Sequence, residues 1–430
     1  MSKSKKMKKA KNLLEVYNNF KVTPLVTRED FSQIYVGRPV KSKIIDDLKD
    51  RIENLEIGKY EKYLFMGHRG CGKSTELNRL PLILDDSRFS IVQYSASSVL
   101  DINDIDVNDF LLSLALKIYE HGKNNGIRFP KGFNDEFMDF AKNVAHIKEK
   151  DKRGRYGVGF SLPDFLIAKI HTESETRDYI RKELGTKISD LIGRINKLVI
   201  IIENKLKKKL VIIIDELDKL TRYEQAENFF YKNYQLLAQP NCIIVYTFPI
   251  SLAFDPYFEN VRHSFREDYV LPQPAVMDKN LTSPDETGVG FFKDIVNKRI
   301  DTKRRLIDEG VLEYAITSTG KLSEFIRLIS DSAIEAYGDG SDKITKKEID
   351  RKLDDLRATY DRTLTKEHIK KLIDIHEKKE AIDETPKNSI ARNLLLSLTA
   401  VEYENKKGER WQDINLILLP LIDKWKKTLE

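Results

Sequence analysis

The stretch that decides the fold is YLFMGHRGCGKST, residues 63–75. It opens with a short apolar run of strand length, passes through a glycine-rich turn and continues into a helix expected to begin near Lys73. Residues 67–74 fit the pattern G-x-x-x-x-G-K-[ST], with Gly67, Gly72, Lys73 and Ser74 in the fixed places. In such a loop the backbone N–H groups converge on phosphate oxygens, and the helix N-terminus favours negative charge. The stretch therefore predicts a phosphate-binding loop.

Each position in the loop has an expected role. Lys73 would reach the β- and γ-phosphates of ATP, and Ser74 would ligate Mg²⁺. A chance match is the alternative, but the apolar run before the loop and the helical pattern after it favour the functional interpretation. We also expect the other residues of the loop and of the helix start to contact the nucleotide: His68, Arg69, Gly70, Cys71 and Thr75.

A second apolar run ends in two acids, LVIIIDE at residues 210–216. A buried strand ending in Asp places a carboxylate at the sheet edge where phosphates bind, so Asp215 is the predicted metal ligand. Glu216 is suited to deprotonate the attacking water. Taken alone, an apolar strand followed by Asp-Glu is more often structural, but the upstream loop favours catalysis.

The fold class follows from further apolar runs at 89–94 and 242–246, neither of which alternates with polar residues. A helical pattern at about 40–56 precedes the apolar runs, and further helical patterns at 109–120, 176–207 and 223–238 lie between them. Buried strands separated by helices indicate a parallel sheet covered on both faces. We expect an α/β core of the P-loop NTPase class.

The separation between Lys73 and Asp215 is long for a compact nucleotide-binding fold, so we expect an insertion at about 122–206. It would contain a hairpin near 156–160 and the long helix from 176. An oligomerisation or partner-binding element and an additional packing layer are both open interpretations.

After Pro272 and Pro274 the strand signals fade, and residues 288–360 predict four helices. Helices near 365–378 and 386–397 follow, and then two extended runs about the turn 405–408, a pattern typical of a small winged helix. The expected domains are an N-terminal arm and lead-in (1–29), an ATPase core (30–275), a helical lid (276–360) and a winged-helix-like module (361–430).

The charge of the chain is concentrated at one end. Six lysines within the first eleven residues account for the whole net charge of +6. A neutral remainder argues against an extensive basic face, although a local patch is compatible with it. We expect these residues to form a disordered arm, with a contact to nucleic acid or an anionic surface as the alternative.

Composition also suggests a compartment. The two cysteines have no disulfide or zinc spacing, which indicates a reducing, cytoplasmic environment. No apolar run is long enough to span a bilayer, and no signal-peptide pattern is present, so no membrane insertion is expected.

With these motifs in place, residues 30–350 resemble the AAA+ and STAND ATPases, close to the branch of origin-recognition and Cdc6-like proteins. Besides the two ATP motifs, IYVGRP at 34–39 is similar to the element that shapes the adenine pocket in that branch. The resemblance implies that Val36 and Arg38 bind nucleotide.

The same resemblance implies three further roles. Thr247, after the run 243–246, would sense the γ-phosphate, although it can instead be a turn residue. Arg262 or Arg266 would reach a neighbouring subunit's site, with an ordinary surface arginine as the alternative. Arg327 would be the lid's phosphate contact, but it stands one helical turn after the expected place, which Ser323 occupies.

The resemblance implies an ATP- and Mg²⁺-dependent switch that assembles into homo-oligomers, binds a protein partner and hydrolyses ATP. Similar ATPases accompany prokaryotic defence systems, so antiphage defence is included as an association. The alternative is an ATP-regulated duplex-DNA-binding protein of origin-recognition or transposition type. A third possibility is an inert nucleotide-binding scaffold, which Glu216 argues against.

Overall fold

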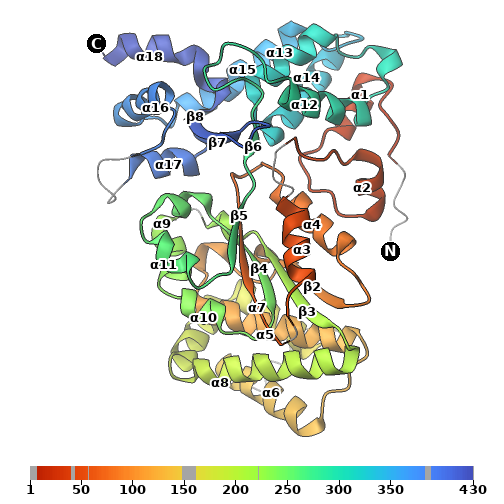
Figure 1. Cartoon of the computed structure of the whole chain (residues 1–430), viewed down its shortest axis with the longest axis vertical. Helices are drawn as coiled ribbons and strands as arrows, with labels where there is room; N and C mark the ends of the chain where they lie inside the picture. Colours follow the sequence, from red (N-terminus) through yellow and green to blue (C-terminus); the bar gives the residue numbers. More distant parts are fainter. Residues whose placement is uncertain are drawn as a thin grey trace. The chain divides into compact units, whose positions relative to one another are not determined.

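The structure, a computed structural model, describes residues 7–39, 44–56, 58–147, 161–220, 222–382 and 389–429. The chain forms two compact units, each built from separate segments (Figure 1). Unit 1 contains Met1–Leu48, Gly67–Leu82 and Val270–Glu430, and unit 2 contains Lys49–Met66 and Ile83–Tyr269.

Unit 2 is organised around a five-stranded sheet in the order β2-β3-β4-β1-β5. Its strands are β1 (Lys62–Met66), β2 (Phe89–Ser95), β3 (Lys209–Asp215), β4 (Ile243–Phe248) and β5 (Glu267–Val270). The pairings β1–β4, β2–β3 and β3–β4 are parallel. The predicted α/β fold is confirmed, and β1 and β4 are buried along their whole length, as unalternated apolar runs require.

The helices of unit 2 include the predicted insertion. They are α5 (Val107–Asn124), α6 (Lys131–Val144), α7 (Leu162–Thr172), α8 (Ser174–Leu206), α9 (Tyr223–Ala226), α10 (Tyr234–Ala238) and α11 (Phe258–Arg262). The apolar stripe of α8, including Leu184, Ile195 and Ile202, is buried, and α8 packs on α5. The hairpin predicted near 156–160 lies outside the described residues.

The continuous helix predicted at 223–238 is wrong. A π-helical turn, Glu227–Tyr231, separates α9 from α10. In this turn the consecutive residues Phe229 and Phe230 are both buried, the first edge-on to Phe110 and the second edge-on to Phe248. The wider turn brings two adjacent rings into the core, which a regular helical period does not favour.

Unit 1 contains two N-terminal helices, the helix after the loop, and the C-terminal part of the chain. Its helices are α1 (Leu13–Asn19), α2 (Arg28–Ile34), most of α4 (Lys73–Ile83), α12 (Glu286–Arg299), α13 (Glu309–Thr319), α14 (Leu322–Gly338), α15 (Lys346–Asp361), α16 (Lys366–Lys378), α17 (Ile390–Leu396) and α18 (Ile422–Leu429). The four helices predicted within 288–360 are confirmed as α12–α15. The helix predicted at 40–56 is confirmed as α3 (Ile44–Glu53), which runs across the boundary between the units.

The predicted C-terminal hairpin is confirmed as β7 (Ala400–Glu404) paired antiparallel with β8 (Arg410–Ile414). A strand that the sequence did not predict, β6 (Gln273–Pro274), pairs parallel with β7 and makes a three-stranded sheet. Two residues are too few to show a period, so β6 carried no sequence signal.

The N-terminal arm differs from its prediction. From Met7 onward it is ordered, with Ala10 fully buried and paired in a parallel bridge with Ile300. The helix that follows adds Leu13, Val16 and Phe20 to the hydrophobic core shared with α12–α15. An apolar face inside a polar lead-in explains why residues next to a lysine-rich stretch fold.

Across the described ranges, no helix combines the length and the apolar character that crossing a bilayer requires.

Candidate nucleotide site

The loop between β1 and α4 has the backbone that its glycines predict. Gly67, Gly70 and Gly72 have φ values of +150°, +81° and +100°. A Cβ atom on Gly67 would stand 2.5 Å from the Leu271 carbonyl oxygen. The positive φ angles and this close approach explain why the loop needs glycine.

Lys73 begins α4, and its side chain turns back over the loop. The residue is only 6% exposed, and Nζ donates hydrogen bonds to the carbonyl oxygens of Gly67, at 2.6 Å, and His68, at 3.1 Å. Because the Lys73 ammonium group is held beside the backbone of the loop, it can exchange these hydrogen bonds for hydrogen bonds to phosphate oxygens.

Other residues of the predicted nucleotide-binding set surround the loop in unit 1. Arg38 donates from Nη1 to the Pro272 carbonyl at 2.9 Å, whereas its buried Nη2 has no hydrogen-bond partner in the described part of the chain. Nη2 would lie 3.1 Å from a Cβ atom on Gly72. Thr75 accepts a hydrogen bond from the Leu25 N–H at 3.2 Å, and Val36 packs on the unit 1 core. Of the remaining loop residues, Cys71 is buried, Ser74 half-buried and Arg69 exposed.

His68 connects the loop to the terminal hairpin. Its ring is fully buried, and Nε2 accepts a hydrogen bond of 2.8 Å from the Glu402 N–H in β7. Burial, together with the positive charges of Lys73 and Lys321, lowers the pKa of His68 to about 3. The imidazole is therefore neutral at physiological pH, which leaves Nε2 able to accept.

The first turn of α14 also contacts the loop. The Ser323 N–H donates to the Gly70 carbonyl at 3.2 Å, and a Cβ atom on Gly70 would overlap the Ser323 hydroxyl. Lys321 lies beside Gly70, is buried, and forms an ion pair of 2.9 Å with Glu324. The sequence reasoning missed Lys321, although a cation directly after the helix-ending Gly320 was a usable signal.

Arg327, the predicted phosphate contact of the lid, is placed differently from the expectation. Its side chain is 66% exposed and pairs with Asp331 at 3.2 Å along the outer surface of α14. Arg327 lies one helical turn, about 6 Å along the axis of α14, beyond Ser323, and its guanidinium pairs with Asp331 on the same helix.

In unit 2, strand β3 ends at Asp215 beside Ser95, a residue that the sequence analysis did not identify. The register of β2 and β3 sets Ser95 opposite Asp215, and the Glu216 N–H donates to the Asp215 carboxylate at 2.7 Å. Glu216 has a left-handed backbone, with φ of +70°. Its carboxylate accepts hydrogen bonds from the hydroxyls of Ser95 and Ser97 and from the Lys219 ammonium.

The surroundings of Glu216 also set its charge. Partial burial raises its pKa, but the hydrogen bonds from Lys219, Ser95 and Ser97 outweigh burial and bring the pKa below the ordinary value. Glu216 is thus an ionised carboxylate with three donors in place.

Thr247 supports the turn that carries Glu216. The side chain is fully buried; its hydroxyl accepts from the Leu217 N–H at 2.9 Å and donates to the Ile214 carbonyl at 3.2 Å. The hydroxyl proton is therefore already donated to Ile214, whereas the predicted γ-phosphate contact would need the same proton.

The two candidate trans-acting arginines are exposed on unit 2. Arg262, 55% exposed, pairs with Asp268 at 3.0 Å and Glu259 at 3.3 Å. Arg266, 60% exposed, pairs with Glu61 at 3.3 Å. Both are accessible, and each has a carboxylate partner to exchange.

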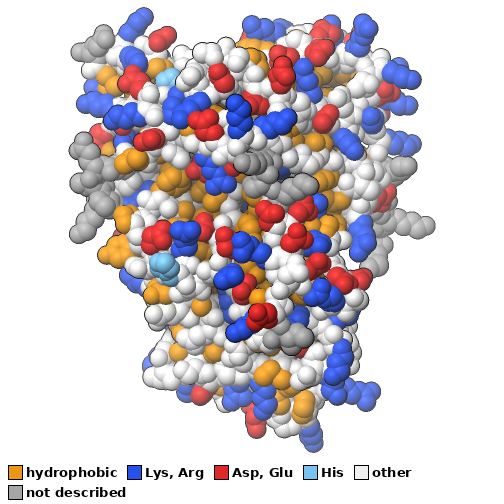
Figure 2. All heavy atoms as spheres, in the orientation of Figure 1, with side chains coloured by type: hydrophobic (Ala, Val, Ile, Leu, Met, Phe, Trp, Pro, Cys, Tyr) orange, Lys and Arg blue, Asp and Glu red, His pale blue; other side chains and the backbone are white. Residues whose placement is uncertain are grey.

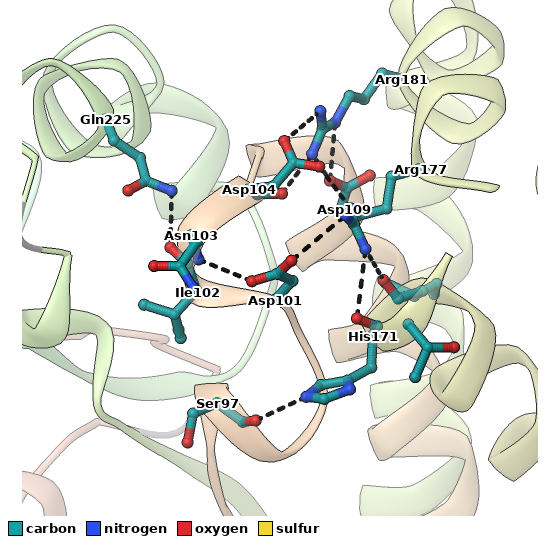
Figure 3. A network of polar contacts seen from close by, with 12 residues as sticks. Ser97, Asp101, Ile102, Asn103, Asp104, Asp109, His171, Arg177, Arg181 and Gln225 are labelled. Atoms are coloured by element: carbon teal, nitrogen blue, oxygen red, sulfur yellow. Dashed lines mark hydrogen bonds and ion pairs between the residues drawn. The ribbon is translucent and has the colours of Figure 1, made fainter. Parts of the chain in front are cut away.

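A network of charged side chains links the Ser97 segment to the insertion (Figure 3). His171 in α7 contacts the Ser97 carbonyl oxygen through Nε2 at 3.2 Å. Arg177 of α8 donates to the carbonyl oxygens of Ile170 and His171 and pairs with Asp104 at 2.8 Å. The insertion therefore holds the turn that follows β2.

Arg181, one turn further along α8, extends this network (Figure 3). It pairs with Asp104 at 2.9 Å and with Asp109 at 2.6 Å. From the other side, Gln225 of α9 donates to the Ile102 carbonyl at 2.8 Å. The segment 97–109 is thus fixed between α7, α8 and α9.

The loop fits a nucleotide triphosphate, since its glycine backbone and Lys73 form a cradle for phosphate oxygens. The predicted metal ligands Ser74 and Asp215 belong to different units, so their joint role stays a prediction. Within the described ranges, no three His, Cys, Asp or Glu side chains gather as a ready metal site.

Comparison with known proteins agrees with the loop and the acidic strand. Residues 42–246 match the model of the KAP family P-loop domain, a range that includes both motifs and most of β4. No curated protein matches the chain.

Several solved structures are similar in fold. They include the Walker-type ATPase of Pyrococcus abyssi, with 13% identity, a TM-score of 0.47 and coverage of 94% of this chain and 99% of that one. The ORC2 protein of Aeropyrum pernix, solved as ADPNP–ADP complexes, has 12% identity, a TM-score of 0.45 and coverage of 96% and 97%. The ORC1 protein of the same organism, in complex with DNA, has 13% identity, a TM-score of 0.40 and coverage of 94% and 97%.

Because these TM-scores are below 0.5, the fold assignment rests on the sheet of this chain, on its phosphate-binding loop and on the family match. Residues 42–246 accordingly form a P-loop NTPase domain that is similar to that of the KAP family.

Proposed function

We propose that the protein is a Mg²⁺-dependent, ATP-hydrolysing molecular switch of AAA+/STAND type whose nucleotide state controls its assembly. One observation carries this proposal. Within unit 1 the phosphate-binding loop is hydrogen-bonded to two other parts of the chain, through Gly70 to Ser323 of the lid and through His68 to Glu402 of the terminal hairpin.

These contacts supply a route from nucleotide to conformation. Phosphate binding draws the Lys73 ammonium away from the carbonyl oxygens of Gly67 and His68, because anionic oxygens are the stronger acceptors. Residues 67–70 then lose a constraint on their backbone. Lid and hairpin, which share those residues, respond to occupancy of the site.

Each predicted residue would have a separate role in ATP hydrolysis. Lys73 would neutralise charge on the transferring phosphate, and Ser74 and Asp215 would hold Mg²⁺, which supplies further charge stabilisation when bound. Glu216 would accept a proton from the attacking water after leaving its present donors. A protein partner and a place in antiphage defence belong to the proposal as associations of the resembling family.

The experiment is to measure the mass of the Glu216→Gln variant in solution with Mg²⁺ and ATP, with ADP and with neither. This variant should keep nucleotide bound without turnover, so ATP alone should produce a defined oligomer. Lys73→Ala is the matched control, because removal of the charge aimed at the phosphates should abolish both binding and growth. A Glu216→Gln protein that binds ATP yet keeps the same mass under all conditions would reject nucleotide-controlled assembly.

An ATP-regulated DNA-binding role through the terminal module is the second candidate. Acidic residues of the hairpin are engaged within unit 1, Glu404 with Arg410 at 2.6 Å and Asp413 with Lys379 at 2.6 Å. Exposed cations remain at the hairpin turn, at Lys406 and Lys407. This small cationic turn supports protein interaction better than tight binding to duplex DNA. A mass increase only on addition of duplex DNA would favour the second role.

A further inference from the structure

The N-terminal arm is fixed to the lid by its backbone. The Ala10 N–H donates to the Arg299 carbonyl at 2.8 Å, and the Asp301 N–H donates to the Ala10 carbonyl at 2.9 Å. The Asn19 side chain donates to the carbonyls of Lys8, at 2.8 Å, and Arg299, at 3.0 Å. The main chain of residues 8–10 is therefore held beside residues 299–301, independently of the lysine side chains.

This docking gathers positive charge that lies far apart in the sequence. Two short segments, 8–11 and 298–305, place their exposed cationic residues on neighbouring stretches of unit 1: Lys8, Lys9, Lys11, Lys298, Lys303, Arg304 and Arg305. None of these side chains forms an ion pair with a described residue. We call the set the arm–lid surface.

Acidic groups close to the arm–lid surface accept hydrogen bonds from its backbone or form ion pairs within unit 1. The Asp301 carboxylate caps the Lys303 N–H at 3.1 Å, and the Glu15 carboxylate accepts from the Lys11 N–H at 2.7 Å. Glu309 binds Lys293. Asp308, three residues after Arg305, pairs with Lys343 at 2.6 Å, and Asp294, one turn before Lys298, is exposed. Figure 2 shows Lys and Arg side chains interspersed with Asp and Glu over much of the face that it draws.

Seven exposed cations without described ion-pair partners create a positive local potential that attracts anions. We propose that the arm–lid surface binds the phosphate backbone of duplex DNA without reading its sequence. This inference is independent of the ATP switch and places the DNA contact on the arm and lid rather than on the terminal hairpin.

The composition of the two segments selects this partner. Neither 8–11 nor 298–305 exposes a large apolar side chain, and insertion into a lipid surface relies on such groups. Neither segment contains an aromatic residue on which unpaired bases would stack. Cations alone match a regular array of duplex phosphates, which is recognised by charge.

The test measures binding of a fluorescent, random-sequence duplex across a range of salt concentrations. One variant carries Lys8→Gln, Lys9→Gln and Lys11→Gln, and a second carries Lys303→Gln, Arg304→Gln and Arg305→Gln. Each should flatten the plot of log K against log salt by about 2.7, which is 0.9 for each lost phosphate contact. Glutamine removes the charge but stays polar, and the arm is held by main-chain bonds, so both variants should unfold at the same temperature as the parent.

Two controls locate the effect. Lys131→Gln, Lys182→Gln and Lys205→Gln remove the same charge from exposed positions of unit 2 and should leave the slope unchanged. Lys406→Gln with Lys407→Gln tests the terminal hairpin. An equal loss of slope in the unit 2 control, or a loss confined to the hairpin variant, would overturn the proposal. So would tight binding to vesicles of anionic lipid in the absence of duplex binding.

Measurements without nucleotide and with the Lys73→Ala variant keep this inference separate from the switch. Persistent, salt-sensitive binding in Lys73→Ala would support the surface even if ATP-driven assembly failed.

Discussion

At the scale of single residues, Glu216 is the most constrained member of the candidate site. It combines a left-handed backbone, which costs about 1–3 kcal/mol for a non-glycine residue, with a carboxylate that accepts from two hydroxyls and an ammonium. A carboxylate engaged in this way is a poor base for water, because the lone pairs that would take the proton are occupied.

Replacement of Ser95 and Ser97 by alanine should therefore release Glu216. We expect ATP turnover to rise several-fold with nucleotide affinity unchanged. The acid limb of the pH–rate profile should move to higher pH: two bonds that lower the Glu216 pKa are lost, and the base must be ionised to act. Steady-state assays from acidic to neutral pH measure both effects. Ser98→Ala, a neighbour bonded to the Ser95 carbonyl, is the control; slower turnover with an unmoved acid limb would contradict the release.

His68 predicts a pH dependence of stability. The folded protein keeps the imidazole neutral down to about pH 3, whereas the unfolded chain takes up a proton near pH 6.5. Acid therefore favours the unfolded state, and each unit below 6.5 should cost about 1.4 kcal/mol of unfolding free energy from this group. Urea titrations at several pH values should show a shallower acid slope in His68→Gln than in the parent. Equal slopes would show that His68 takes up its proton in the folded state.

Residue types and spacing predicted the loop and the acidic pair because phosphate chemistry restricts both. The contacts of Lys321, Ser95 and His68 were not predictable. Each is created by an approach between segments distant in sequence, such as His68 and Glu402, and no local spacing encodes that approach.

At the scale of elements, α7 and α8 act on the site through the segment after β2 (Figure 3). Arg177 is almost buried and bonds to Asp104 and to the α7 carbonyls. Arg177→Gln should cost about 1–3 kcal/mol, because it removes the buried guanidinium that binds the α7 carbonyl oxygens and the half-exposed Asp104. It should also raise turnover, as we expect for the joint replacement of Ser95 and Ser97, since α7 positions Ser97 through His171. Lys182→Gln on the exposed face of α8 is the control. Destabilisation without a change in turnover would separate the insertion from catalysis.

Periodicity predicted the long elements well and the short ones poorly. The stripe of α8 extends over many turns, so its signal is strong, and its burial on α5 agrees with the packing-layer interpretation. The break between α9 and α10 and the strand β6 depend on tertiary partners, Phe110, Phe248 and β7. The ordered arm was missed because its lysines dominate the composition while Ala10 supplies the buried contact.

At the scale of the whole molecule, the loop and the acidic strand belong to different compact units, and the candidate trans-acting arginines lie on the unit with Glu216. An arginine that completes a neighbour's site must be exposed and able to exchange its carboxylate partner. Arg262 and Arg266 meet both conditions, because surface ion pairs contribute only about 0–1 kcal/mol.

If either arginine acts between subunits, its alanine variant should bind ATP normally yet lose turnover by a factor of 10³ or more. A mixture with Glu216→Gln protein should then regain activity. In a mixed oligomer the arginine variant supplies an intact Glu216, and the Glu216→Gln subunit supplies the missing guanidinium to the same site. Arg327→Ala, exposed on α14, is the matched control and should keep full turnover. Mixtures that assemble without any recovery would show that each site is completed within one subunit, and ATP-driven assembly would then serve partner binding rather than catalysis.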